Sequence, residues 1–231
     1  MTLTLAGHSA PSVGFEVPLE MLAACHLRVQ DQCTTLLRLV PHLAAHGADR
    51  QAQQAATALM RYFDTSARHH HDDEERDLFP ALIESVAGAD AVCLHTLTAA
   101  QVRVRTLTAA LTAEHRELEA RWKALRQVLA QVAAGQVLVQ VAAGQVLAQV
   151  AAGQAAPLAA DDVRGFTGLY ARHIAREEAE LLPMAQRLLS DAELDRIGLA
   201  MRLRRAVPGG PATPSPQAPA HSVRLPKAST S

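Results

Sequence analysis

Two segments of this chain share an eleven-residue pattern of histidine, acidic residues, leucine and proline. The pattern H-x-x-x-E-E-x-[DE]-L-[FL]-P occurs at residues 70–80 and again at residues 173–183. In a helix, a histidine and a glutamate four positions apart project from the same face, one turn apart. Two such faces meeting inside a helical bundle would bring two imidazoles and two carboxylates to one point, which is how helical proteins build sites for two metal ions.

A single histidine also lies on each helix expected before a copy of this pattern. His26 is flanked by Leu22 and Val29 at helical spacing, and a comparable apolar stripe surrounds His115. Imidazole and carboxylate together suit iron, manganese or zinc. Because carboxylates can bridge two cations whereas imidazoles bind terminally, we assign the glutamates as bridges and the histidines as terminal ligands, two for each metal ion. The predicted ligands are His26, His70, Glu74, His115, His173 and Glu177.

Each of these features has a simpler reading when it is taken alone. A lone histidine on an apolar helix face is more often part of an ordinary core than a ligand, and a single H-x-x-x-E pair commonly lies on a solvated face. The repetition of the whole pattern favours the metal site. A phenylalanine also stands seven residues before each histidine of the pattern, at Phe63 and Phe166.

Residues next to the predicted ligands are assigned other positions. The three consecutive histidines at 69–71 point about 100° apart, so we expect only one of them to face the site, and the register of the second copy selects His70. The acidic residues that follow the two bridging glutamates, Glu75 and Glu178, are expected to support the ligands or to lie on the surface. Glu119, four residues after His115 on the third helix, could add a further ligand, but we favour an exposed position for it.

Helical periodicity predicts two helical hairpins of similar length. Pro18 suits the first turn of the first helix, and the second helix runs from about residue 50 to residue 84. A third helix is expected to start near residue 90, and Asp161 or Asp162 can cap a fourth. Each hairpin therefore carries a lone histidine on its first helix and an H-x-x-x-E pair on its second.

Three segments have no place in these hairpins. We predict a flexible arm over residues 1–17 and, because residues 206–231 are rich in Pro, Gly, Ser and Ala, a disordered tail. A nine-residue unit occurs three times in succession over residues 127–153. Nine residues advance half a turn beyond two full turns, so successive copies point their apolar sides in opposite directions. We interpret them as an extension of the connection between the third and fourth helices.

Composition excludes several classes of partner. The formal net charge of −1 and the sequence pI of about 6.8 do not suggest nucleic acid as a partner. No run of 18 apolar residues indicates a membrane span. Three cysteines, an odd number, without a secretory signal favour reduced thiols and a cytoplasmic protein.

Four segments together resemble the hemerythrin-like, or HHE cation-binding, family over about residues 15–205. They are PLEMLAACH ending at residue 26, HHHDDEERDLFP at 69–80, EHRELEARW at 114–122 and HIAREEAELLP at 173–183. The resemblance implies an all-α, up-down-up-down four-helix bundle. It also implies a carboxylate-bridged centre of two non-haem iron ions, held by the six predicted ligands.

The third helix departs from the oxygen-carrying members of that family, which use a fifth histidine one turn away from the first. Here the neighbouring positions are Leu111 and Glu119. We therefore expect an open or water-filled coordination position and a protein that binds O2 or NO in sensing, scavenging or storage, rather than an enzyme. Two alternatives stay open: a di-iron enzyme of iron oxidation, peroxide or NO detoxification or iron–sulfur repair, and a metal-free helical interaction module. The sequence does not decide the oligomeric state.

Overall fold

The computed structural model describes residues 14–87, 94–136 and 158–205, with the side chains of residues 94–98 left out. These residues form helices joined by short turns, and no strand occurs among them. Residues 1–13 of the arm predicted over residues 1–17, the second and third copies of the nine-residue unit beyond Gln136, and the predicted tail lie outside the described residues.

The first half of the chain is a long helix followed by a second helical run made of four segments. The second run was predicted as one helix, but it is interrupted at Thr65, where φ of −125° and ψ of −74° leave the helical region. The amide of Thr65 bonds to the carbonyl oxygen of Tyr62, three residues back, and not to the residue four back. The segments are α1 Pro18–His46, α2 Arg50–Asp64, α3 Ser66–Asp73, the π-helix η1 Glu74–Leu78 and α4 Phe79–Ala87.

The second half repeats this plan and then adds a final helix. The fourth predicted helix begins at Ala160 after an N-cap at Ala159, so Asp161 and Asp162 lie in its first turn and are not its caps. Two carboxylates in a first turn favour the helix through its dipole. The segments are α5 Leu94–Ala133, α7 Ala160–Arg176, the π-helix η3 Glu177–Leu181, α8 Leu182–Leu188 and α9 Asp191–Arg205.

A π-helical turn occupies the same position in both copies of the duplicated pattern. The amide of Phe79 bonds to the carbonyl oxygen of Glu74, five residues back, and the amide of Leu182 bonds likewise to Glu177. A proline follows each of these amides, and its ring would clash with the carbonyl four residues earlier in a regular α-helix. The widened turn accommodates that proline, and π-turns of this kind are frequent at functional sites.

The turn between α1 and α2 is built by local hydrogen bonds. Gly47 adopts a positive φ of 65°, and the carboxylate of Asp49 accepts a hydrogen bond from the amide of Ala52, which caps α2. The same carboxylate lies 3.0 Å from the ring of His42, a partner that the sequence pattern did not indicate. Pro41 lies inside α1 and does not end it.

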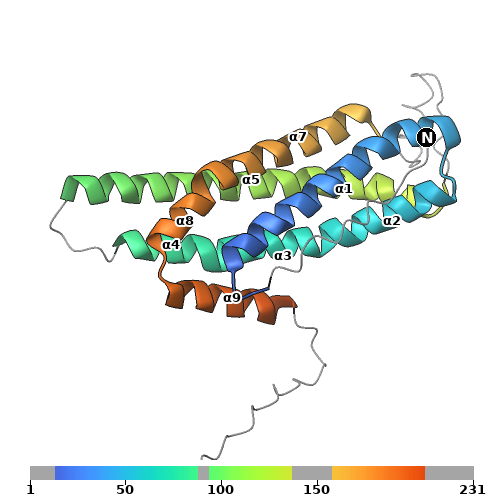
Figure 1. The fold of residues 1–231 in the computed structure, drawn as a ribbon. Coiled ribbons are helices and arrows are strands. Elements are labelled where there is room, and N and C mark those ends of the chain that lie inside the picture. The colour runs from blue at the N-terminus through green and yellow to red at the C-terminus, as the bar shows by residue number, and fades with distance from the viewer. Residues whose placement is uncertain (1–13, 88–93, 137–157, 206–231) are drawn as a thin grey trace, which may run out of the picture.

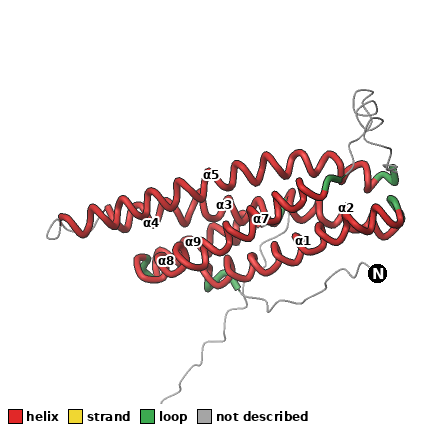
Figure 2. Tube along the Cα trace, turned by 90° about the horizontal axis from the view of Figure 1, so that it is seen from above, coloured by secondary structure: helices red, strands yellow, loops and turns green. Residues whose placement is uncertain are grey.

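The long helical runs lie side by side, and α9 lies along the outside of the run that contains α3 and α4, below it in Figure 1 (Figures 1 and 2). There, α9 packs against α1 and α3. Two of its arginines, Arg204 and Arg205, bond to the buried carboxylate of Asp73, and Arg204 also bonds to Asp77 at 2.6 Å. The last helix is thereby tied to the run that carries the first copy of the duplicated pattern.

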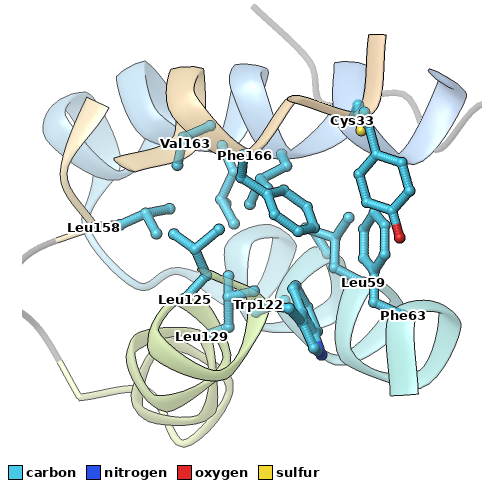
Figure 3. Close-up of a cluster of buried hydrophobic side chains, with 14 of the residues drawn as sticks. Cys33, Leu59, Phe63, Trp122, Leu125, Leu129, Leu158, Val163 and Phe166 are labelled. Atoms are coloured by element: carbon cyan, nitrogen blue, oxygen red, sulfur yellow. The ribbon is translucent and has the colours of Figure 1, made fainter. Parts of the chain in front are cut away.

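The core consists of two apolar clusters. Figure 3 shows part of the aromatic cluster, in which Phe63 from α2, Trp122 from α5 and Phe166 from α7 point toward one another. The rings of Phe63 and Trp122 are 4.7 Å apart and those of Phe63 and Phe166 5.3 Å, so the two phenylalanines noted in the sequence meet here. The second, aliphatic cluster contains Leu22, Leu78, Leu82, Leu111, Phe79, Leu181 and Met184.

Among the helices of residues 14–87, 94–136 and 158–205, none combines the length and the apolar character needed to cross a bilayer.

Candidate metal centre

A layer of polar side chains separates the two apolar clusters. On α1 it follows Leu22 of the aliphatic cluster and precedes Val29 of the aromatic cluster, and on α5 it lies between Leu111 and Leu118. Each member of the layer is at most 4% exposed. The layer consists of the six residues singled out in the sequence: His26, His70, Glu74, His115, His173 and Glu177.

These six residues form two groups that share both glutamates. One group adds His26 and His70 to the two carboxylates, and the other adds His115 and His173. Within each group, one nitrogen or oxygen atom from every residue lies within 4.8 Å of the others. The first hairpin therefore supplies both histidines of one group, and the second hairpin supplies both histidines of the other. Each hairpin also contributes one of the two shared carboxylates.

Each carboxylate spans the two groups, with one oxygen facing a histidine of each. In Glu74, Oε1 lies 3.6 Å from Nε2 of His70 and Oε2 lies 3.3 Å from Nε2 of His115. In Glu177, Oε2 lies 3.0 Å from Nε2 of His26 and Oε1 lies 2.9 Å from Nε2 of His173. This is the placement that a carboxylate bridging two cations would need.

The buried oxygens of these two carboxylates accept no hydrogen bond, although all four are out of contact with solvent. Leaving a buried carboxylate without a partner is unfavourable. Burial, together with the negative charge of Glu177, raises the pKa of Glu74 well above its ordinary value. A pair of cations between the groups would supply the missing partners, so the donor set of this layer fits two metal ions.

The orientation of the histidine rings is also compatible with metal binding. Nε2 of His115 and Nε2 of His173 lie only 3.1 Å apart with their rings inclined at 71°, and the rings of His26 and His70 are inclined at 87°. Since the lone pair of an imidazole nitrogen lies in the ring plane, steeply inclined rings can direct two lone pairs to one point. Each pair is therefore compatible with terminal binding to a shared cation.

Three glutamates hold the outer nitrogens of these rings. Nδ1 of His115 lies 2.7 Å from Glu75, and Nδ1 of His26 lies 3.1 Å from Glu178. Both contacts cross between the hairpins, and they give a specific role to the two acidic residues that follow the shared carboxylates. A carboxylate at Nδ1 favours the tautomer that leaves Nε2 free to bind a metal.

The third of these glutamates was missed in the sequence. Glu114 lies 2.9 Å from Nδ1 of His173 and is itself bonded to Arg176. Glu114 directly precedes His115, but it supports a histidine on another helix. Its only sequence signal is an acidic residue inside the segment EHRELEARW, and that signal does not reveal its partner.

The electrostatics of the layer differ from ring to ring. Burial lowers the pKa of His70 to about 3, which keeps this imidazole neutral and able to act as a ligand. Burial acts in the same direction on His173, but the carboxylate of Glu177, with Oε1 2.9 Å from Nε2, prevails through its negative charge and raises the pKa of His173. In the metal-bound protein, cations would take the place of the proton on His173 as the positive charge of the layer.

The expectation that only one of the three consecutive histidines faces the site is wrong. His70 lies beside His26, with ring centroids 5.0 Å apart, while His71 is stacked on His115 at 3.9 Å. Because α3 passes along a layer wide enough for two groups of ligands, side chains 100° apart can reach both of them. Glu119, by contrast, is exposed as expected.

His71 is close to the second group without having the geometry of a ligand to it. One of its nitrogens lies within 4.8 Å of nitrogens of His115 and His173. However, the planes of His71 and His115 are inclined by only 13°. Two stacked imidazoles cannot both place a cation in their ring planes about 2.1 Å from nitrogen. We therefore leave His71 out of the ligand set.

Comparison with known proteins identifies relatives of this chain. The family model described as the hemerythrin HHE cation-binding domain matches residues 17–185. A curated protein of Haemophilus influenzae, described as an uncharacterized protein, is 30% identical over 190 residues. The match covers 82% of this chain and 91% of that relative.

Proposed function

This chain belongs to the hemerythrin family of HHE cation-binding domains, and on that premise we propose that it is a non-haem di-iron protein that binds O2 or NO. Its role would be sensing, scavenging or storage of such a small ligand. The observation that carries the proposal is the pair of buried carboxylates, each of which spans both groups of histidines and has no hydrogen-bond donor of its own.

The proposed ligand set consists of the six residues of the polar layer. Glu74 and Glu177 would bridge, His26 and His70 would complete one position, and the remaining pair of histidines the other. Two ferrous ions held there would supply the electrons and the open coordination position that binding of O2 or NO requires. The assignment of iron over manganese or zinc rests on membership of the family and not on the donor atoms alone.

The protein's own residues prepare this centre in two ways. Glu75, Glu114 and Glu178 orient three of the rings through Nδ1, so that Nε2 faces the layer. The apolar clusters lie on either side of the layer, and Leu78 and Leu111 of the aliphatic cluster are fully buried, so water and protons are kept from a bound ligand on those two sides.

An open coordination position is supported by the residues around His115. One turn before it lies Leu111, which is fully buried, and one turn after it lies Glu119, which is exposed. Neither offers a further imidazole. The proposed protein therefore keeps a position for an external ligand on the side of His115 and His173.

The finer architecture is part of the same proposal. We place the centre inside an up-down-up-down four-helix bundle made of α1, the α2–α4 run, α5 and the α7–α8 run. The short turn between α1 and α2 and the parallel course of the four runs support this arrangement. We also propose a cytoplasmic location, in keeping with the free, buried thiols of Cys25 and Cys33.

Metal analysis with optical spectroscopy tests the proposal. The protein is reconstituted anaerobically with ferrous iron, and iron per chain and absorbance are measured before and after dithionite and air. We expect about two irons per chain and the near-ultraviolet absorption of a diferric centre. Glu177→Gln should lose iron, whereas Glu180→Gln, on the same π-helix but outside the layer, should keep it.

Two other results would replace the proposal. Iron content below about one per chain after reconstitution, in a stable fold, would favour the metal-free interaction module. Steady turnover of peroxide or ferrous ion would identify a di-iron enzyme. Saturable binding of O2 or NO without turnover is the result expected for a sensor, scavenger or store.

A further inference from the structure

A pocket of about 570 Å³ leads from the protein surface to one side of the polar layer. Exposed residues of α5, Arg116 and Glu119, line its outer part. His71 and His115 line its inner part, next to the aromatic side chains of Trp122 and Tyr170. The pocket therefore joins solvent to the group that contains His115 and His173.

The other group does not face this pocket. His26 is 0% and His70 2% exposed, and neither of them lines it. His115 belongs to the lining although it is only 4% exposed, because it closes the inner end. The two metal positions proposed above are thus unequal in their access to solvent, even though each has two histidines and shares both carboxylates.

His71, which lines the inner part of the pocket, has an unused nitrogen. Its Nε2 is buried and has no hydrogen-bond partner. The ring is held by stacking on His115 at 3.9 Å and lies 6.0 Å from the ring of Tyr170. A buried nitrogen without a partner is unfavourable unless something fills the space in front of it. Stacking on His115 removes the option of binding the same cation as that residue.

We infer that external ligands reach the centre through this pocket and bind on the side of His115 and His173, where Nε2 of His71 donates a hydrogen bond to them. This inference rests on the proposed function, since it needs iron in the layer. It names the class of ligand as a small molecule or anion that can accept a hydrogen bond, and it assigns His71 as a residue that contacts that ligand and not the metal.

Azide binding to the iron-loaded, oxidised protein tests the hydrogen bond. His71→Leu removes the donor and keeps an apolar side chain of similar reach, and His69→Leu is the matched control, because His69 is on the same helix and does not line the pocket. Loss of a hydrogen bond to a charged ligand should weaken azide binding and speed its release about 10- to 100-fold in His71→Leu. The iron content should equal that of the wild type.

The rate of NO association with the reduced protein tests the route. Glu119→Trp places a large ring at the outer part of the pocket, and Ala120→Trp places the same ring on the next, exposed position of α5 outside it. We expect Glu119→Trp to slow NO association several-fold and Ala120→Trp to leave it unchanged, with equal iron content in both variants. Both substituted positions are exposed, so the core is not altered.

Three outcomes would overturn the inference. Equal azide affinity in His71→Leu and His69→Leu would remove the hydrogen bond, and equal NO association in both tryptophan variants would remove the route. Loss of iron in His71→Leu alone would make His71 a metal ligand. In each of these cases wild-type iron content stays near two per chain, whereas failure of the proposed function would be seen as loss of that iron.

Discussion

Glu74 should destabilise the metal-free protein at neutral pH, and Glu74→Gln should reverse that effect. The carboxylates of Glu74 and Glu177 contribute atoms within 4.8 Å of each other to the same groups. Coulomb's law gives about 3.5 kcal/mol of repulsion for two unit charges at that distance and an effective dielectric constant of about 20. Without cations the pair therefore keeps a proton, and burial followed by the charge of Glu177 places it on Glu74, whose pKa is raised.

The sign of the pH dependence follows from this raised pKa. Below the ordinary value of 4.5, Glu74 is protonated in both the folded and the unfolded protein and contributes no difference. As the pH rises, the unfolded chain loses the proton and the folded chain keeps it, so the free energy of unfolding falls by about 1.4 kcal/mol per pH unit. The loss continues to grow for as long as the folded protein keeps the proton that the unfolded chain has released.

Urea unfolding of chelator-treated protein, followed by circular dichroism at several pH values between 5 and 7, measures this effect. The free energy of unfolding of Glu74→Gln minus that of the wild type should grow by about 1.4 kcal/mol per pH unit. Glu119→Gln, an exposed carboxylate, should show no such growth. In the iron-loaded protein the order should reverse, because the variant lacks a proposed bridge.

A pH-independent difference between Glu74→Gln and the wild type would refute the reasoning. It would mean that the two carboxylates do not share a buried proton in the absence of metal. A lower stability of the metal-free variant at pH 7 would contradict it in a second way, because a neutral side chain of the same shape should be favoured there.

Three further predictions concern the surroundings of the layer. Glu114→Gln should weaken iron binding about 10- to 100-fold, measured by competition with a chelator, because the carboxylate orients His173. Phe63→Ala should lower the free energy of unfolding by about 3–5 kcal/mol in urea, since the ring is 2% exposed in the aromatic cluster; a loss below 1 kcal/mol would mean that the cluster collapses around the gap. Asp73→Ala should leave two arginines of α9 without their buried partner and destabilise the fold by about 3–5 kcal/mol, with amide exchange in α9 rising first; unchanged exchange there would show that α9 is held by other contacts.

Sequence pattern was sufficient for most features that depend on local spacing. The start of α1 at Pro18 and the all-helical class agree with helical periodicity, which each segment of the chain carries by itself. The duplicated pattern also singled out the buried residues that the structure brings together, because a repeat of eleven positions constrains both copies to one register. The start of α9 also has a local signal, a capping box formed by Ser190 and Glu193.

Contacts between helices could not be predicted in this way. The partnership of Glu114 with His173 joins residues 59 positions apart, and the bonds from α9 to Asp73 join residues more than 130 apart. Nothing in the spacing of either residue specifies such a partner, because the partner depends on how two helices are rotated against each other. The π-turns could not be predicted for a related reason: a proline inside a helix removes a backbone hydrogen bond, but its presence at Pro80 and Pro183 does not specify the form of the turn that accommodates it.

By itself, the sequence determined which side chains share a helix face, because 3.6 residues per turn relate every position to its neighbours along the chain. Only the tertiary structure decided that His71 stacks on His115 and that both of these residues line the same pocket. These properties belong to the space between helices, whose shape depends on the packing of all of them at once.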